Sequence, residues 1–487
     1  MGNNNSIQLD TYKNNVCTIS ESIKQIYTGI PGSSASPTEA MVVEFKNNTK
    51  YKNKLIKYGF LKIWIDPISL KYVFKHVYDK SYYSSALGGL NYEIYVYRHV
   101  IRELLDYNIC PNFIKYLGSS KRCSWKNLTN ITSKIRPKDI KDGEHVRRTK
   151  QNIIQTIYSE DLGERQAIDS DNYKNLNSKL LALETLNIED LNFNILVNEA
   201  IEDKYTETLR DFLLRNEDIN ELNSVMFQCM AGCYAMSMSK MVHNDLHTGN
   251  IWVIKLPEKR TFIYNYNYIE YMFETQYMVK IYDFDRSYVE RFGNNPQLDE
   301  ETAGFSQSNE YIPNRDMIKC ISYFYKYQSP EIKEIILESV QTKEENKLNI
   351  YIPEILNSCM IKYDNVALTK NDYIELFQTR EDILYNIAKM AEFHNREIRD
   401  SDKVKLTNEG RYYYCNKEMF DNNGDIFKHR EGTVQMLILG IKQLNNKFEE
   451  QENLINNLQA ELDAIRKKDE KKAERKAERK RRKEGRE

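Results

Sequence analysis

One segment, residues 241–253, constrains this chain more than any other. It reads Met-Val-His-Asn-Asp-Leu-His-Thr-Gly-Asn-Ile-Trp-Val, and it places an aspartate (Asp245) and an asparagine (Asn250) five residues apart in a polar loop. An apolar run follows Asn250 at once, and a second apolar run further along ends at another acid, Asp283. Short apolar runs bounded by polar residues are typical of buried strands. The pattern therefore predicts two strands that, together with the loop, deliver two carboxylates and one amide.

This set of side chains suits phosphoryl transfer from ATP. One carboxylate orients the attacking hydroxyl or accepts its proton, while an amide oxygen and a second carboxylate hold Mg²⁺ on the phosphates. Here the chain resembles the protein-kinase-like superfamily, whose catalytic loop reads H-x-D-x-x-x-x-N and whose metal-binding motif reads D-F-G. His243, Asp245 and Asn250 complete the first pattern, and the second is altered to Asp283-Phe284-Asp285.

The resemblance implies a role for each of these residues. Asp245 would be the catalytic base, or the group that orients the acceptor hydroxyl, while Asn250 and Asp283 would bind Mg²⁺ or Mn²⁺. His243 would brace the loop backbone and take no part in the chemistry. Further along the chain, Asp316 resembles the buried aspartate that ties the catalytic-loop backbone to a helix in kinases.

Two lysines compete for the role of clamping ATP. Lys62 follows a Gly/Ser segment, a strand and a turn, in the order that a phosphate-covering loop requires. Lys75 lies 18 residues before Glu93, a spacing usual for the lysine–glutamate pair of kinases. Lys62 is preferred, because no second glycine lies between Gly32 and Gly59 to build a loop ahead of Lys75.

Other ATP-binding groups follow from the same resemblance. Gly29 and Gly32 would form a weak glycine-rich loop over the phosphates. A helix predicted over 91–105 carries the glutamate that would pair with the lysine. Glu199 and Ala200 fall where hinge backbone groups would hydrogen-bond adenine.

Three residues depart from the pattern of ordinary protein kinases. Asn244 stands in place of an arginine, so control through a phosphorylated activation loop that contacts this arginine is not expected. His247 stands in place of a lysine that meets the γ-phosphate, and Asp285 replaces the glycine of D-F-G and adds charge near the metals. The long interval before Asp283 predicts that residues 256–277 form a Tyr-rich insertion, in a loop between two strands.

The resemblance implies an ATP-dependent phosphotransferase. The chain resembles divergent serine/threonine protein kinases encoded by large nucleocytoplasmic DNA viruses, which implies that a protein would be the substrate. Two alternatives stay open. His247 and the lack of an A-P-E motif favour a small-molecule kinase similar to aminoglycoside and choline kinases. Asp285 and the weak glycine loop favour a pseudokinase scaffold that does no chemistry.

The order of elements predicts an α+β chain with the bilobal fold of protein kinases, a small mainly β lobe and a large mainly α lobe. Further segments are expected on both sides of the kinase-like domain. The predicted parts are a flexible N-terminus (1–20), the kinase-like domain (21–400, with an insertion at 119–190), an irregular linker (401–432), a coiled coil (433–466) and a basic tail (467–487).

The two ends of the chain predict partners. Within 434–465, nine of ten heptad core positions are apolar, which favours self-association through a coiled coil. The tail from Arg466 onward carries 13 Lys and Arg against 6 Asp and Glu, and it could bind nucleic acid or an acidic surface. Gly2 lies in an N-myristoylation pattern, which alone would give a weak membrane anchor.

Composition bears on the compartment. The eight cysteines are scattered without a C-x-x-C pair, which favours a reducing, intracellular location. This would be the host cytoplasm or the virion if the chain is viral. No run of eighteen apolar residues exists, and the amino terminus is too polar for a secretory signal.

Overall fold

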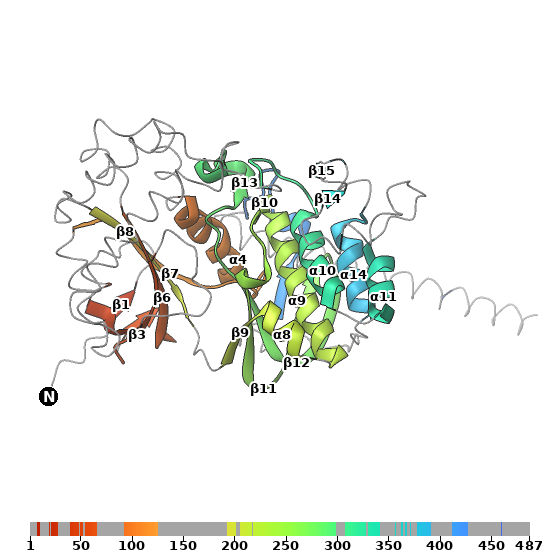
Figure 1. Ribbon diagram of the computed structural model, residues 1–487, viewed down its shortest axis with the longest axis horizontal. Coiled ribbons are helices and arrows are strands. Elements are labelled where there is room, and N and C mark those ends of the chain that lie inside the picture. Colours follow the sequence, from red (N-terminus) through yellow and green to blue (C-terminus); the bar gives the residue numbers. More distant parts are fainter. Residues whose placement is uncertain are drawn as a thin grey trace, which may run out of the picture. The chain divides into compact units, whose positions relative to one another are not determined.

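The computed structural model (Figure 1) is a mixed α+β chain, which confirms the predicted class. It divides into two units, the first ending at Asp425 and the second beginning at Ile426. The structure describes residues 7–9, 19, 21–27, 39–47, 49–51, 54–65, 92–124, 192–200, 205–216, 218–298, 307–327, 330–340, 356, 362–363, 366–367, 371, 377–390, 412–426 and 459.

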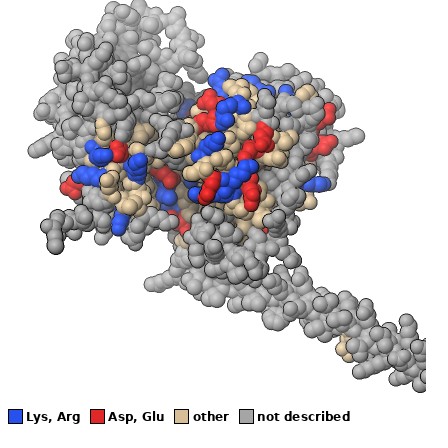
Figure 2. Space-filling model, turned by 90° about the horizontal axis from the view of Figure 1, so that it is seen from below, with Lys and Arg blue, Asp and Glu red and all other residues tan. Residues whose placement is uncertain are grey.

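Several predictions concern residues outside these ranges. Gly2 and most of the N-terminus at 1–20 are among them, as are the coiled coil at 433–466, apart from Gln459, and the basic tail at 467–487. No helix within the described ranges is both long and apolar enough to cross a membrane. On the face in Figure 2, the basic and acidic side chains of the described residues lie intermixed.

A five-stranded antiparallel sheet forms the first part of the larger unit. Its strand order is β2-β3-β6-β8-β7, so β6 is central and places Lys62 in the middle of the sheet. A small separate sheet, β1-β4-β5, is built from short strands. The strands are β1 (Ile7–Leu9), β2 (Ile23–Tyr27), β3 (Glu39–Phe45), β4 (Thr49–Tyr51), β5 (Lys54–Leu55), β6 (Tyr58–Ile65), β7 (Tyr116–Ser124) and β8 (Asn192–Glu199).

Strand β7 corrects one predicted boundary. The insertion was expected over 119–190, but residues 119–124 belong to β7 and pair with β8. The register of this pair shifts between Ser120 and Cys123. Because of this irregularity, the strand does not show the simple alternation of polar and apolar residues by which strands are predicted.

The helix predicted over 91–105 is confirmed as one continuous helical stretch over 92–106. It is α-helical at 92–96, widens to a π-helix over Tyr97–Ile101 (η1) and ends as α4 (Arg102–Asp106). Single π turns inside α-helices occur often at functional sites, because they redirect side chains between turns.

A long hairpin replaces the loop expected over 256–277, so that prediction is wrong. Strand β11 (Ile251–Tyr266) pairs with β12 (Ile269–Ile281) along most of its length. The turn consists of Asn267 and Tyr268, which both have positive φ (49° and 66°), as a two-residue turn matched to strand twist requires. Tyrosines of this segment lie on the buried face of the sheet. Tyr264, Tyr271 and Phe273 pack around Phe227 with ring centroids 5.2–5.5 Å apart.

Helices cover this hairpin. Helix α9 (Ile219–Met238) is buried along nearly its whole length and packs on β12 and on two other helices. Gly232 allows the close approach, since a Cβ there would lie 2.6 Å from Ile281 Cδ1. The helices are α8 (Leu209–Arg215), α9 (Ile219–Met238), α10 (Arg315–Tyr327), α11 (Pro330–Val340) and α14 (Arg380–Met390).

The linker predicted as irregular over 401–432 contains ordered structure. Strand β16 (Tyr412–Cys415) pairs in parallel with β11, and short β9 (Thr206–Thr208) pairs with the other half of β11. The turn after β16 reaches Gly424, whose φ is +76° and whose α-carbon packs against the backbone of Ser239 at the end of α9.

This contact gives a stability prediction. Gly424→Ala puts a Cβ 2.5 Å from the Ser239 carbonyl carbon, at a φ that alanine rarely adopts. We expect a loss of about 3 kcal/mol in unfolding free energy, from strain plus overpacking. The matched control is Gly293→Ala, where φ is +74° but a Cβ meets nothing within 4 Å. Urea unfolding should show a clearly smaller loss of unfolding free energy for Gly293→Ala than for Gly424→Ala. Equal losses would contradict the close contact between Gly424 and Ser239.

Candidate active site

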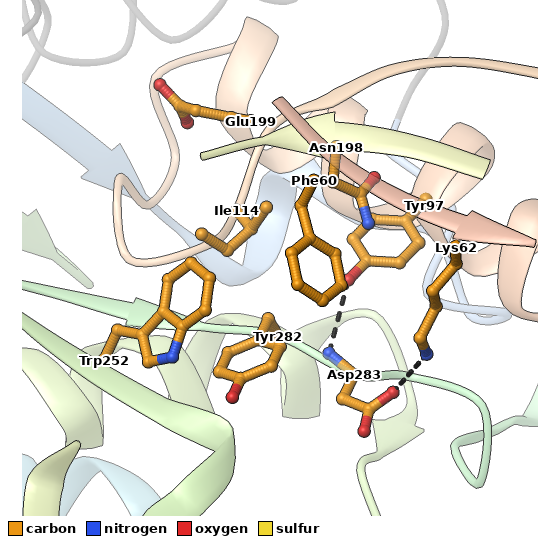
Figure 3. A pocket seen from close by; sticks show the side chains of 9 residues that line it. All are labelled: Phe60, Lys62, Tyr97, Ile114, Asn198, Glu199, Trp252, Tyr282 and Asp283. Carbon is orange, nitrogen blue, oxygen red and sulfur yellow. Dashed lines mark hydrogen bonds and ion pairs between the residues drawn. The ribbon is translucent and has the colours of Figure 1, made fainter. Parts of the chain in front are cut away.

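Lys62 joins three distant segments of the chain. Its Nζ lies 2.9 Å from Glu93 Oε1, on the helix, and 2.5 Å from Asp283 Oδ1, which follows β12. Lys62 is 6% exposed and Glu93 is fully buried. Figure 3 shows Lys62 and Asp283 at one end of a pocket. The structure thus brings Lys62 together with Glu93, whereas Lys75 lies outside the described residues, as do Gly29 and Gly32.

Lys62 and its carboxylate partners stabilise one another in their charged forms. Burial alone would lower the pKa of Lys62, but the carboxylates of Asp283 and Glu93 outweigh it and hold this pKa well above 10.5. Burial likewise raises the pKa of Asp283, yet the Lys62 ammonium reverses this and lowers it below 3.8. Burial raises the pKa of Glu93 to about 7, against the opposing effect of Lys62. Buried charges of this kind are tolerated only when they are paired.

The helix is held in place by tyrosines on both sides of Glu93. Tyr97, in the π-helical turn, accepts a hydrogen bond from the Asp283 backbone N–H at 3.3 Å and packs edge-on against Phe284. Tyr92 accepts a hydrogen bond from the Val289 N–H at 2.8 Å. The same hydroxyl lies 3.1 Å from the carbonyl of Gly293 and donates to it. The segment after Asp283 therefore anchors the helix that carries Glu93.

Tyr92→Phe tests this anchor. It removes one hydroxyl and leaves the buried Val289 N–H without its partner, at a cost of about 1 to 3 kcal/mol in unfolding free energy. A helix loosened in this way should misplace Glu93 and lower ATP turnover by about tenfold, which corresponds to about 1.4 kcal/mol. Tyr95→Phe, on the exposed side of the same helix, is the control and should match wild type in urea unfolding and in turnover. If Tyr92→Phe and Tyr95→Phe gave the same unfolding free energy and the same ATP turnover, the Tyr92 hydroxyl would not be what anchors the helix.

Asp283 and Asn244 adopt unusual backbone conformations. Their φ angles are +69° and +63°, in the left-handed region that L-residues rarely enter. Asparagine and aspartate tolerate this region better than most residues do. Backbone strain of this kind clusters at functional sites, where the surrounding contacts enforce it.

The loop at 243–250 is braced from two sides. The His243 backbone N–H donates to Asp316 Oδ2 at 2.6 Å, and its ring Nε2 donates to the Tyr282 carbonyl at 2.9 Å. These contacts agree with the structural roles expected for His243 and Asp316. They fasten the loop to α10 and to the strand end that precedes Asp283.

Asn250 links the loop to the same strand end. Its side-chain nitrogen donates to the Asp245 carbonyl at 2.9 Å, and its own carbonyl accepts from the Tyr282 N–H at 3.1 Å. Because the amide nitrogen is engaged, the amide oxygen is the atom that can act as a ligand. The Asp245 carboxylate is half-buried and lies 3.5 Å from Gln307 Nε2 and 3.9 Å from His247 Nε2. Hydrogen bonds through Asn250 therefore link the backbone of Asp245 to that of Tyr282, the residue before Asp283.

Asn244 has a clear structural role. Its side-chain nitrogen donates to the carbonyls of Arg286 and Ser308, and its oxygen accepts from Arg315. The residue that replaces the expected arginine thus ties the segment after Asp283 to the loop without any charge.

Asp285 does not use the conformational freedom of the glycine that it replaces, because its φ is not positive. It is half-buried, and burial together with the nearby Asp283 carboxylate raises its pKa well above 3.8. Its backbone carbonyl accepts a hydrogen bond from Asn295 at 2.7 Å. The substitution is therefore compatible with an ordinary backbone at this position.

A pocket open to solvent adjoins the Lys62 cluster, with about 230 Å³ of space that includes part of the adjoining solvent (Figure 3). Aromatic rings shape it. Phe60, from β6, meets the edge of Trp252 at 6.2 Å, and Trp252 packs on Tyr282 at 4.4 Å. The lining residues are Phe60, Lys62, Tyr97, Ile114, Asn198, Glu199, Trp252, Tyr282 and Asp283.

The sequence reasoning missed most of these aromatic residues. Trp252 and Tyr282 were visible only as members of apolar runs beside Asn250 and Asp283. Phe60 lies two residues before Lys62 on the same strand, and this spacing places both on one face of the sheet. That alternation is the signal that could have identified Phe60.

Glu199 and Ala200 differ in their relation to the pocket. Glu199 lines it, whereas Ala200 does not. The Glu199 N–H donates to the Lys115 carbonyl at 2.7 Å, and the Ala200 N–H lies 3.4 Å from the Tyr58 carbonyl. Both of these N–H groups are therefore engaged within the protein, and a ligand would have to compete for them.

The donors for a divalent cation are few. Within the described part of the chain, no three His, Cys, Asp or Glu side chains are grouped to hold a metal. Asp283 and Asn250 supply one carboxylate and one amide oxygen, which fits Mg²⁺ bound jointly by protein, water and phosphates. Neither a scan against protein-family models nor a search of curated proteins finds a match to this chain.

Proposed function

We propose that this chain is a phosphotransferase with a bilobal, protein-kinase-like fold. It would transfer the γ-phosphate of ATP to a hydroxyl, most simply that of a serine or threonine in a protein. The observation that carries the proposal is the buried Lys62 with its two carboxylate partners, Glu93 and Asp283. A buried ammonium held between two carboxylates at the end of a pocket is placed to meet the phosphates of a nucleotide.

The arrangement of elements supports the same proposal. The lysine lies on the central strand of a five-stranded sheet, and its glutamate lies on a helix that follows in the chain. The acid Asp283 comes from the end of a hairpin strand in the part of the unit that also contains the long helices. Sheet, helix and hairpin thus meet at one point, as a fold with two lobes around a nucleotide requires.

Each residue of the site would have one role in the reaction. Lys62 orients the phosphates, and Glu93 keeps its ammonium in place. Asp245 holds the acceptor hydroxyl and takes its proton, and the braces from His243 and Asp316 keep the loop fixed meanwhile. Mg²⁺, bound by Asp283 and Asn250, would supply charge neutralisation on the phosphates.

One observation favours the small-molecule alternative. His247 is half-exposed beside Asp245, at the place where an acceptor would enter. An imidazole there does not present the fixed positive charge of a lysine. The pseudokinase alternative rests on Asp285 and on the weak glycine loop at Gly29 and Gly32; Asp285 does not need the positive φ that a glycine would allow.

The test is the fate of the label from γ-labelled ATP. Purified chain with Mg²⁺ or Mn²⁺ is incubated with a mixture of protein acceptors, and separately with a mixture of hydroxylated small molecules. Label on Ser or Thr of protein supports the protein-kinase proposal, and label on small molecules supports the alternative. If the chain neither binds nor hydrolyses ATP, the phosphotransferase proposal is wrong.

A further inference from the structure

Helix α10 reaches the loop that carries Asp245 through two side chains on one face. Asp316 accepts a hydrogen bond from the His243 N–H at 2.6 Å, and Lys319 Nζ donates to the Asn244 carbonyl at 3.4 Å. Residues three apart on a helix are neighbours, so one turn of α10 makes both contacts. Both contacts fall on the two residues that directly precede Asp245.

The ammonium of Lys319 lies close to the acceptor side of the site. Burial lowers the pKa of Lys319, and the Asp245 carboxylate is the largest opposing influence, followed by Asp316. Arg315 and Arg286 are the cations that face it.

A tether to a carbonyl does not by itself require a charge. The Lys319 contact is at the long end of the hydrogen-bond range, whereas the Asp316 contact on the same helix is short. Removing part of the hydration of an ammonium costs more free energy than doing the same to the neutral amide of a glutamine, which could donate an equivalent hydrogen bond. The charge of Lys319 therefore suits a place where negative charge develops during a reaction.

The other cations near the site have partners of their own. Arg315 donates to Asn244 Oδ1 and Ser308 Oγ, and Arg286 donates to Gln307 Oε1. Lys62 is engaged by Glu93 and Asp283, on the nucleotide side. His247 occupies the loop position where a fixed cation was expected, and its ring Nδ1 accepts a hydrogen bond from the Gly249 N–H at 3.0 Å, which leaves no proton on Nδ1. From this geometry we infer that Lys319 holds the transferred phosphoryl group against the acceptor hydroxyl at Asp245. This inference rests on the proposed function.

The step balances without a further reactant. A bond forms between the acceptor oxygen and the γ-phosphorus, and the bond from that phosphorus to the bridging oxygen of ATP breaks. The electron pair of the broken bond leaves with ADP, and the hydroxyl proton passes to Asp245. Lys319 keeps its protons and contributes positive charge and N–H donors. Lys319→Met removes that contribution, whereas Lys319→Arg retains the charge.

The experiment compares Lys319→Met, Lys319→Arg and Lys326→Met, a control at the exposed end of the same helix. For each full-length variant we would measure kcat, the KM for ATP and the midpoint of thermal unfolding. We expect Lys319→Met to lower kcat by about 100-fold to 1,000-fold with the KM for ATP unchanged. Lys319→Arg should recover most of the loss, and the Lys326 variant should match wild type.

Three outcomes overturn the inference, and they are distinguishable. If Lys319→Met keeps the wild-type kcat, the residue takes no part in transfer and the proposed function still stands. If both Lys319 variants lose activity equally and unfold at a lower temperature, Lys319 is only a structural tether. If the wild-type chain transfers no phosphate to any acceptor, the inference and the proposed function fall together.

Discussion

Replacing Asp245 with asparagine is expected to lower the rate of phosphate transfer by about 100-fold to 10,000-fold, the range typical of a positioned acid–base group. ATP binding should not change, because Asp245 lies on the acceptor side and makes no contact with Lys62 or Asp283 among the interactions of the described residues. Asparagine has nearly the same size, so the hydrogen bond from Gln307 can persist through its oxygen. Single-turnover kinetics with labelled ATP would separate the loss of transfer from any loss of binding.

Glu258→Gln provides the control for Asp245→Asn. It also neutralises one carboxylate, but on an exposed part of the hairpin away from the site. It should transfer phosphate at the wild-type rate. If Asp245→Asn also retains that rate, then Asp245 is not the group that handles the acceptor hydroxyl.

Lys62→Met is expected to have the second large effect, on stability and on ATP binding together. It leaves the fully buried Glu93 without its partner and removes the cation next to Asp283. Breaking a buried ion pair by removing one partner costs about 3 to 5 kcal/mol. Urea unfolding would measure the stability loss, and equilibrium titration with ATP and Mg²⁺ would measure the loss of affinity.

Two further variants serve as controls for Lys62→Met. The double variant Lys62→Met with Glu93→Gln removes the unpaired charge, so it should regain part of the stability without regaining ATP binding. Lys75→Met tests the other lysine that the sequence left open, and it should bind ATP as wild type does. If Lys75→Met lost ATP binding while Lys62→Met kept it, Lys75 and not Lys62 would be the lysine that binds ATP.

Much of the site follows from local sequence patterns. The spacing from His243 to Asn250, followed by an apolar run, identifies the loop and the strand after it, because both are set by residues close together in the chain. Lys62 was favoured from the order of glycines and strands, and the structure pairs it with Glu93. The helix α9 was also predictable, since its apolar residues leave no polar face to expose.

Other features depend on residues far apart in the sequence. The segment 256–277 was predicted as a loop because the interval between Asn250 and Asp283 is longer than a tight hairpin requires. The burial of its aromatic residues depends on Phe227 of α9, which packs on Tyr264 and Phe273. Strand β16 pairs with β11 across more than 140 residues of chain, so no local pattern could place it. The position of Lys319 beside the loop likewise results from the packing of α10.

The most direct measurement is affinity labelling with an acyl-phosphate derivative of ATP, which transfers its acyl group to a lysine beside the bound phosphates. If Lys62, Glu93 and Asp283 form the phosphate site, mass spectrometry should find the label on Lys62. Excess ATP with Mg²⁺ should then protect Lys62 from labelling, whereas the exposed Lys326 should react without protection. Protected labelling of Lys75 in place of Lys62, or no ATP-protected lysine at all, would contradict the proposed site.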